Sequence, residues 1–313
     1  MINIYKTLEG KLVSLTNRED GCWIALTNPS EQELLKTASD NEIELDDLKA
    51  ALDDEERSRI EKEDHYTMIL VDVPTIEMHN DKETYTTIPM SIIVTPSALI
   101  TVCLQPIPVL QSFIDSKIRN FHTHMKTRFI LQILYKNATL FLQYLRNVNR
   151  KSEQVEKKLH GSTKNQELIE LLDLEKSLVY FTTSLRSNEM VLEKLLRTDS
   201  IKKYPEDTDL LEDVIIENKQ AIEMANIYSG ILSGMMDAFA SVISNNLNIV
   251  MKFLATITIV MSIPTMIFSA YGMNVASSGM PFASSPWGFL IVIILSIILS
   301  LMVAFVFARK NLF

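Results

Sequence analysis

Two long apolar runs without a charged residue stand near the C-terminal end of the sequence. Residues 253–271 form the first run and residues 287–308 the second, which is 22 residues long. At about 1.5 Å per residue the second run reaches roughly 33 Å, enough to cross a hydrocarbon core of about 30 Å. We therefore predict two membrane-spanning helices joined by a short external loop.

Residues 1–105 show a different pattern, in which short β-rich apolar runs alternate with acidic stretches of helical spacing. This alternation predicts an α/β domain. The expected strands are residues 22–26, 66–73, 91–94 and 99–104, and the expected helices are residues 30–38 and 42–56. The pairs Gln105-Pro106 and Ile107-Pro108 then mark the end of this domain.

Long helices are expected in the rest of the chain. From Leu134 onwards apolar residues recur at steps of three and four, which predicts an antiparallel helical hairpin within residues 106–207. No proline or turn cluster interrupts the chain from Thr208 to Pro264, so we predict one continuous helix that combines a stalk with the first span. The segments that follow the hairpin are this helix at 208–271, an external loop at 272–285, the second span at 286–308 and a basic tail at 309–313.

Charge is distributed unevenly along the chain. Residues 1–237 hold 27 basic and 39 acidic side chains, a net charge of −12, and no acid follows Asp237. Such an acidic portion disfavours nucleic acid as a partner and favours cations. Lys252, Arg309 and Lys310 stand at the edges of the spans, and the first residues lack the apolar core of a secretion signal. We therefore expect both termini in the cytosol of a prokaryotic cell and two passes through its plasma or inner membrane.

One face of the predicted long helix is small or polar. Lipid offers hydroxyls and amides no hydrogen-bond partner, so this face must meet another helix or water. Close helix packing is one explanation, and a pore enclosed by several copies is the other. Asn248 and Asp237 favour the pore, because an amide and a carboxylate near the membrane are costly unless hydrated. The stripe consists of Asp237, Ser241, Ser244, Asn248, Met251, Ala255, Thr258, Ser262, Thr265 and Ser269.

The sequence Tyr271-Gly272-Met273-Asn274 closes the first span. In this position, after an acidic α/β domain and a long helix, it resembles the CorA family of magnesium transporters, and the resemblance covers the whole chain. It implies a funnel-shaped homopentamer in the lipid bilayer, with the long helix around one pore and the Gly-Met-Asn turn as the external selectivity filter. It also implies that the stripe lines the pore, and that Met251 and Leu254 form an apolar constriction that closes by dewetting.

The chemistry of the implied filter suits magnesium. This ion dehydrates reluctantly, so a ring of Asn274 amide oxygens can hydrogen-bond its hydration shell without removing it. Gly272 is expected to provide backbone freedom for the turn, or to cap the helix.

The resemblance also implies that internal magnesium is sensed by acids between neighbouring cytosolic domains. Asp213 fits one partner, whereas Ala50 stands where the other acid is expected. The acids close to Ala50 that would replace it are Asp46, Asp47, Asp53 and Asp54. The alternative is that these acids form only a solvated helix face.

The expected function is gated, passive magnesium influx with feedback closure, and with magnesium itself as the ion rather than a cofactor. No catalytic triad, phosphate-binding glycine loop or Cys/His cluster appears, so we predict no enzyme. His122 and His124, two apart on an expected helix, would point to different faces. Two alternatives remain: transport of zinc, cobalt or nickel, which Met273 disfavours, and a membrane-anchored helical scaffold, which the polar stripe disfavours.

Overall fold

The computed structural model describes residues 1–79, 82–159, 165–197, 201, 204–274, 279–282 and 285–310. The chain divides into two compact units, Met1–Met236 and Asp237–Phe313. The expected α/β domain and helical hairpin therefore fall within one unit. Of the expected external loop, residues 275–278 and 283–284 lie outside the described residues, as do residues 311–313 of the expected tail.

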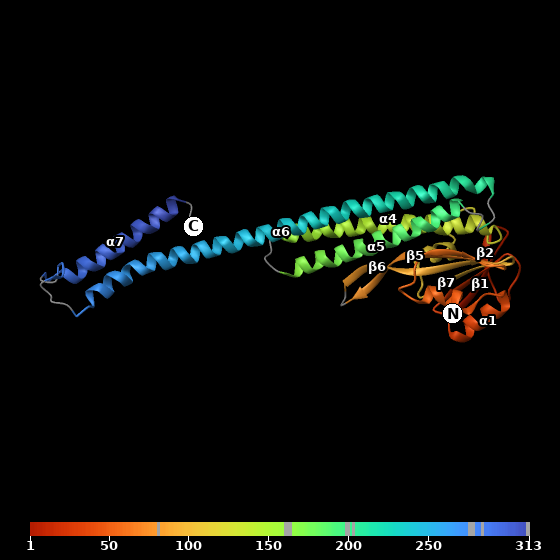
Figure 1. The fold of residues 1–313 in the computed structure, drawn as a ribbon, viewed down its shortest axis with the longest axis horizontal. Helices are drawn as coiled ribbons and strands as arrows, with labels where there is room; N and C mark the ends of the chain where they lie inside the picture. The colour runs from red at the N-terminus through yellow and green to blue at the C-terminus, as the bar shows by residue number, and fades with distance from the viewer. Residues whose placement is uncertain are drawn as a thin grey trace. The chain divides into compact units, whose positions relative to one another are not determined.

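The first unit is built on a mixed sheet, which has seven strands among the described residues, in the order β2-β1-β3-β7-β6-β5-β4 (Figure 1). Neighbouring strands are antiparallel except β3 and β7, which pair in parallel with Cys22 opposite Ala98. The strands are β1 Ile2–Leu8, β2 Lys11–Leu15, β3 Cys22–Thr27, β4 Arg59–Lys62, β5 Thr67–His79, β6 Lys82–Val94 and β7 Ala98–Cys103.

The neighbouring strands β3 and β7 are mostly apolar and almost completely buried because helices cover both faces of the sheet. On one face, Ile24 packs in a cluster with Leu34 of α1 (Glu31–Asn41) and Leu48 of α2 (Leu45–Lys49). On the other face, the ring of Trp23 lies 6.5 Å from that of Phe121 and 5.2 Å from that of Phe129. These layers form the core of the first unit.

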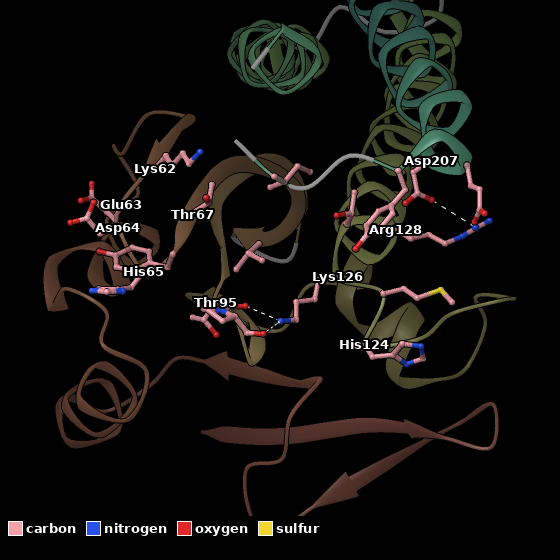
Figure 2. A pocket seen from close by; sticks show the side chains of 18 residues that line it. Lys62, Glu63, Asp64, His65, Thr67, Thr95, His124, Lys126, Arg128 and Asp207 are labelled. Carbon is pink, nitrogen blue, oxygen red and sulfur yellow. Dashed lines mark hydrogen bonds and ion pairs between the residues drawn. The ribbon is translucent and has the colours of Figure 1, made fainter. Parts of the chain in front are cut away.

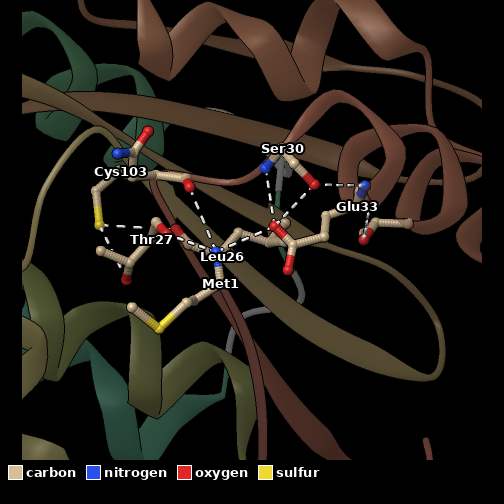
Figure 3. A network of polar contacts seen from close by, with 8 residues as sticks. Met1, Leu26, Thr27, Ser30, Glu33 and Cys103 are labelled. Atoms are coloured by element: carbon tan, nitrogen blue, oxygen red, sulfur yellow. Dashed lines mark hydrogen bonds and ion pairs between the residues drawn. The ribbon is translucent and has the colours of Figure 1, made fainter.

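Helix α1 begins with a capping box. The Ser30 hydroxyl accepts from the Glu33 backbone N–H, and the Glu33 carboxylate accepts from the Ser30 backbone N–H at 2.8 Å (Figure 3). The Met1 ammonium also donates to Glu33, at 3.1 Å. Backbone and ammonium donors together lower the pKa of Glu33. This arrangement satisfies N–H groups that have no partner within the helix, and it fixes the start of α1 beside the end of β3.

Long helices lie along the second face of the sheet, as Figure 1 shows for α4 and α5. Phe141 of α4 and Phe181 of α5 pack edge to face, 5.3 Å apart, and Phe181 also contacts Tyr85 of β6. The helices that follow the sheet in this unit are α3 Pro108–Ile114, α4 Lys126–Leu159 and α5 Asn165–Arg197, followed by the short 3-10 helix η2 Pro205–Asp207 and the first part of α6.

Helix α6 runs without a break from Thr208 to Tyr271, the bounds that the absence of turn signals predicted. Pro264 lies inside it. Its last part shares the second unit with α7, Gly288–Arg309. Both helices are long and apolar enough to span a membrane, with a mean hydropathy of 1.9 for α6 and 3.2 for α7 in their most apolar windows. Only 6% and 11% of these windows are buried within the chain, unlike the core helices of soluble domains.

Three expectations about local structure are wrong. A single helix at 42–56 is replaced by α2 and the 3-10 helix η1, Ala50–Leu52, because Asp53 accepts a hydrogen bond from the Glu55 N–H and starts a turn. The strands β1, β2 and β4 were not predicted, because they lie at or near the edges of the sheet and carry polar residues. The segment 121–125, which contains His122 and His124, is not helical.

Candidate ion pathway along α6

The small and polar stripe predicted from the sequence is open to the surroundings in the single chain. All of its residues lie on α6 within the second unit. Ser262 is partly buried, and the side chains that are exposed are Asp237, Ser241, Ser244, Asn248, Met251, Ala255, Thr258, Thr265 and Ser269. Leu254, the second residue of the expected constriction, is 52% exposed. This face is therefore available to water or to other copies of the chain.

Helix α7 covers a different face of α6. Beyond Phe253, Thr256 of α6 is buried, and the partly buried residues are Val260, Ser262, Ile263, Pro264 and Ile267. Among these, Thr256, Val260, Ile263 and Ile267 share one face of the helix, which we take as the α7-facing set. On α7 they are Gly288, Val292 and Ser296. At about 100° per residue, the centre of the α7-facing set lies roughly 140° around the helix from the centre of the stripe. The chain thus uses one side of α6 for its own second span and leaves nearly the opposite side uncovered.

Hydroxyl groups of the stripe donate to the backbone of their own helix. Thr258 Oγ1 donates to the Leu254 carbonyl at 2.8 Å, and Thr265 Oγ1 donates to the Met261 carbonyl at 3.1 Å. Ser262 does the same toward Ile259 at 2.7 Å. With their protons committed, these hydroxyls offer oxygen lone pairs outward. A hydrated cation presents water O–H groups, so a row of acceptors is the complementary surface.

The Gly-Met-Asn turn follows the last turn of α6 directly. The Gly272 N–H donates to the Phe268 carbonyl at 2.9 Å, and the Met273 N–H donates to the Ala270 carbonyl at 3.4 Å. Gly272 is not among the residues with positive φ, and an added Cβ would meet its nearest neighbour at an ordinary 3.5 Å. Gly272 therefore adopts no left-handed backbone, and it directly follows the last residue of α6, the helix-capping position that was the alternative expectation. Asn274 is exposed just beyond the helix end.

Two contacts that the sequence did not reveal shape the loop between the spans. The Tyr271 hydroxyl donates to the Pro281 carbonyl at 2.8 Å. A Cβ on Gly288 would stand 2.2 Å from the Phe282 carbonyl oxygen, a distance that real Cβ atoms do not show. An isolated glycine at the start of an apolar run was the signal available for the second contact. The first contact holds the segment before α7 close to the end of α6, and the second holds it close to the start of α7.

Basic side chains mark one end of each span. Lys252 stands at the start of the spanning part of α6, and Arg309 ends α7, with Lys310 next to it. All three side chains are exposed. From Lys252 to Tyr271 the helix rises about 29 Å, and α7 rises about 33 Å. These lengths match the hydrocarbon core, with the basic residues placed for contact with lipid headgroups.

The candidate regulatory acids lie in the first unit. Asp213 is exposed on α6, and Asp46 and Asp54 are exposed near α2. Asp47 is partly buried and accepts a short hydrogen bond from the Tyr66 hydroxyl. Burial, and then this hydrogen bond, raise the pKa of Tyr66. Asp53 is exposed, but one of its oxygens accepts from the Glu55 N–H at 3.1 Å.

The described part of the chain holds no group of three or more His, Cys, Asp or Glu side chains that is arranged for a metal ion. A single chain therefore does not assemble the acids into a site by itself. His122 and His124, expected to point apart, instead place their rings 5.4 Å from each other in a loop. They make a pair without a third ligand among the described residues.

A cavity of about 690 Å³ lies in the first unit, lined by the turns after β4 and β6 and by the start of α4 (Figure 2). Three of its charged side chains, Lys126, Arg128 and Asp207, make polar contacts within the protein. Lys126 donates to the carbonyls of Thr95, at 2.9 Å, and of Pro96, while Arg128 faces the carboxylate of Asp207 at 3.7 Å. Burial lowers the pKa of Lys126. The cavity thus joins three segments of the fold through internal polar contacts.

Comparison with known proteins agrees with this geometry. The sequence profile of the family described as "CorA-like Mg2+ transporter protein" matches residues 18–309. The "Cobalt/magnesium transport protein CorA" of Methanocaldococcus jannaschii is 29% identical over 293 residues, which cover 92% of this chain and 90% of that protein.

Solved structures show the same fold. "The complete structure of CorA magnesium transporter from Methanocaldococcus jannaschii" matches with a TM-score of 0.83 at 26% identity and covers 99% of this chain and 98% of that one. The "structure of the full-length CmaX protein" matches with a TM-score of 0.70 at 13% identity, covering 99% of this chain and 97% of that one, which shows a shared fold. The family profile spans most of the sequence, and the chain therefore belongs to the CorA family.

Proposed function

We propose that this chain forms a gated, passive pathway for hydrated magnesium, which enters a prokaryotic cell through five copies around one axis. The observation that carries the proposal is the acceptor-lined face of α6, which lies about 140° from the face that α7 covers. The membership in the CorA family and the name of the relative support the ion. Each charge that moves inward gains about 2.3 kcal/mol per 100 mV, so a divalent ion gains roughly twice that without any cofactor.

The filter of this pathway consists of Gly272, Met273 and Asn274, with the Asn274 amide as the group that meets the hydrated ion. The decisive experiment is magnesium influx into proteoliposomes, comparing the natural chain with Asn274→Ala at matched incorporation. Loss of influx in the variant supports the filter. Equal influx in both proteins would show that other residues form the filter. If neither protein conducts, even without internal magnesium, the result would favour the anchored scaffold.

The constriction consists of Met251 and Leu254, both more than half exposed in one chain and therefore free to face one another across an axis. Apolar side chains in a narrow pore exclude water and so exclude ions. Leu254→Gly should raise the resting magnesium conductance, whereas the same substitution at the equally exposed Val250, off the stripe, should not. An unchanged conductance in Leu254→Gly would count against the gate.

Feedback closure is proposed to use Asp213 and the acids near Ala50 from a neighbouring copy. Asp46 and Asp54 are the most available partners, because Asp47 already bonds Tyr66 and Asp53 bonds the Glu55 N–H. Magnesium bound between these carboxylates would hold neighbouring domains together when the ion is plentiful. If Asp213→Ala closes at the same internal magnesium concentration as the natural chain, this arrangement is wrong.

Cobalt is the second ion that a specific observation favours, since the relative from Methanocaldococcus jannaschii is named for both ions. A competition assay with cobalt, nickel and zinc against magnesium influx ranks them. The stoichiometry is measured by native mass spectrometry of the full-length protein. A mass other than five chains would contradict the pentamer, and labelling of either terminus from outside intact cells would contradict the cytosolic placement of both.

A further inference from the structure

Three of the buried asparagines of the first unit lie on three different long helices. Asn137 of α4, Asn188 of α5 and Asn218 of α6 are only 3%, 4% and 3% exposed. A buried amide without partners is costly, so each side chain must be held by hydrogen bonds. Each of them bonds the backbone of a different element from its own. The three side chains therefore connect their helices to other elements of the fold.

Two of the asparagines hold an unpaired point of the sheet. Strand β4 begins at Arg59, opposite Leu70, so no strand lies beside Asp72 on that side of β5. The Asn188 amide accepts from the Asp72 N–H at 2.9 Å and donates to the Asp72 carbonyl at 2.8 Å. Asn137 donates to the same carbonyl, also at 2.8 Å. Side chains of α4 and α5 thus replace the missing strand at the edge of β5.

The third asparagine links α6 to α5. On α6, Asn218 stands in the middle of an otherwise apolar buried stripe. Its amide donates to the carbonyl of Leu185 on α5 at 3.1 Å. The apolar members of the stripe are Leu211, Val214, Ala221, Ala225 and Leu232. An amide among apolar residues fixes the register of α6 against α5, because sliding by one turn would leave it unpaired.

The two links meet in one turn of α5. Leu185, which accepts from Asn218, and Asn188, which clamps Asp72, are three residues apart and so lie within the same helical turn. Ser58 adds a bond to the Asn188 amide oxygen at 3.1 Å. The hydrogen bonds that connect the sheet to α5, and those that connect α5 to α6, are therefore made by the same turn of α5.

We propose that Asn188 and Asn218 are positioning residues that transmit a displacement of the sheet to α6. This inference rests on the proposed feedback closure, in which acids near α2 and Asp213 on α6 bind magnesium from neighbouring copies. With the amides in place, the sheet, α5 and α6 move as one body, and magnesium binding acts on the whole of α6. Without them, α6 shifts register against α5. Part of the free energy of magnesium binding then moves the elements of one chain against each other and does not act on the pore.

The test measures magnesium influx by full-length protein in liposomes at a series of internal magnesium concentrations. Asn188→Ala and Asn218→Ala should each raise the concentration for half closure by about fivefold or more, with open-state influx unchanged. The matched control is Ser177→Ala, also on α5 and 1% exposed, whose hydroxyl bonds the Asp173 carbonyl within the same helix. It should leave the half-closing concentration unchanged. If Asn188→Ala does not assemble, Asn188→Ser, which keeps one donor, should shift it in the same direction.

A second measurement separates transmission from simple loss of stability. Asp213→Ala placed in the Asn188→Ala background should add less to the half-closing concentration than it adds alone, because both act on one path. Additive effects, or equal half-closing concentrations in the natural chain and both alanine variants, overturn the inference. A natural chain that never closes overturns the proposed feedback itself, and the inference falls with it. That failure is visible before any variant is compared.

Discussion

The hydroxyl of Tyr271 donates a hydrogen bond to the carbonyl oxygen of Pro281, with 2.8 Å between the two oxygens. Tyr271 is the last residue of α6, and Pro281 belongs to the segment that leads into α7. The bond therefore connects the two sides of the loop that begins with Gly272, Met273 and Asn274. It restrains the backbone that presents the proposed filter.

Tyr271→Phe should weaken conduction without unfolding the protein. The substitution keeps the ring and removes one hydrogen bond, worth about 0.5–1.5 kcal/mol, so magnesium influx should fall by about two- to tenfold. Proteoliposome influx at matched incorporation measures this. Tyr135→Phe, on the partly exposed surface of α4, is the control and should conduct as the natural chain does. Equal influx in both variants would show that the Pro281 contact does not restrain the filter.

Gly288→Ala should disturb the same loop from the other side. An added Cβ would stand 2.2 Å from the carbonyl oxygen of Phe282, which itself has a φ of 61° and little freedom to move. Overpacking of this kind costs about 1–3 kcal/mol. The unfolding temperature of the full-length protein in detergent should fall. Gly279→Ala, which has no neighbour within 4 Å of its added Cβ, should keep the natural unfolding temperature.

The native cysteines permit a labelling test of the stripe. Cys22 and Cys103 are 0% and 1% exposed, and burial raises the pKa of the Cys103 thiol to about 11. The thiolate is the nucleophile that attacks thiol reagents, and both thiols are buried out of reach of the reagent, so both residues should stay unmodified in the folded protein at neutral pH. When one further cysteine is introduced, any rapid labelling therefore occurs at the introduced residue. The natural chain, labelled in the same way, is the blank.

Thr258→Cys should react with a charged, membrane-impermeant thiol reagent, and the reaction should block magnesium influx. Thr258 lies on the uncovered stripe, where we propose water. Ile263→Cys, on the face of α6 that α7 covers, should react far more slowly and leave influx intact. Labelling rates and influx are measured on the same vesicles. Similar rates at both positions would contradict a water-filled path along the stripe.

Most of the fold was predictable because its signals are local. The unbroken run without turn residues gave α6 its bounds, and the continuous apolar stretch Cys22–Leu26 indicated a strand covered on both faces. Strands β1 and β4 were missed because strands near a sheet edge need no continuous apolar run. The expected helix at 42–56 ended early at Leu52, since Asp53 turns the chain through its own side chain.

The candidate ion pathway was also predictable only in part. The stripe follows from residue spacing alone, but the face of α6 that α7 covers depends on tertiary packing. The contact of Tyr271 with Pro281 joins residues that no local pattern connects, and the contact of Gly288 with Phe282 was signalled only by an isolated glycine at the start of an apolar run. The role of Gly272 in the turn that presents Asn274 stays a prediction, because its φ is not positive and its N–H continues the helical hydrogen bonds to Phe268.

Asp72 gives the fold a pH dependence whose sign can be measured. Burial raises the pKa of its carboxyl group, and a hydrogen bond from Ser184 offsets part of that rise. Between the unfolded pKa of about 3.9 and the raised folded value, the folded state keeps a proton that the unfolded state has lost. The contribution of Asp72 to the free energy of unfolding therefore falls as pH rises through this window. Asp72→Asn removes that fall and keeps a polar group in place.

The unfolding temperature of Asp72→Asn relative to the natural chain should thus increase from about pH 4 upward and level off above the folded pKa. Asp115→Asn is a control of opposite sign, because Lys117, and then Gln111, lower the pKa of Asp115. Its carboxylate stabilises the folded state only once it is ionised, so the unfolding temperature of Asp115→Asn relative to the natural chain should decrease with rising pH between the lowered folded pKa and the unfolded value of about 3.9, and level off above that. Parallel curves for the two variants would refute the assignment of a raised pKa to Asp72.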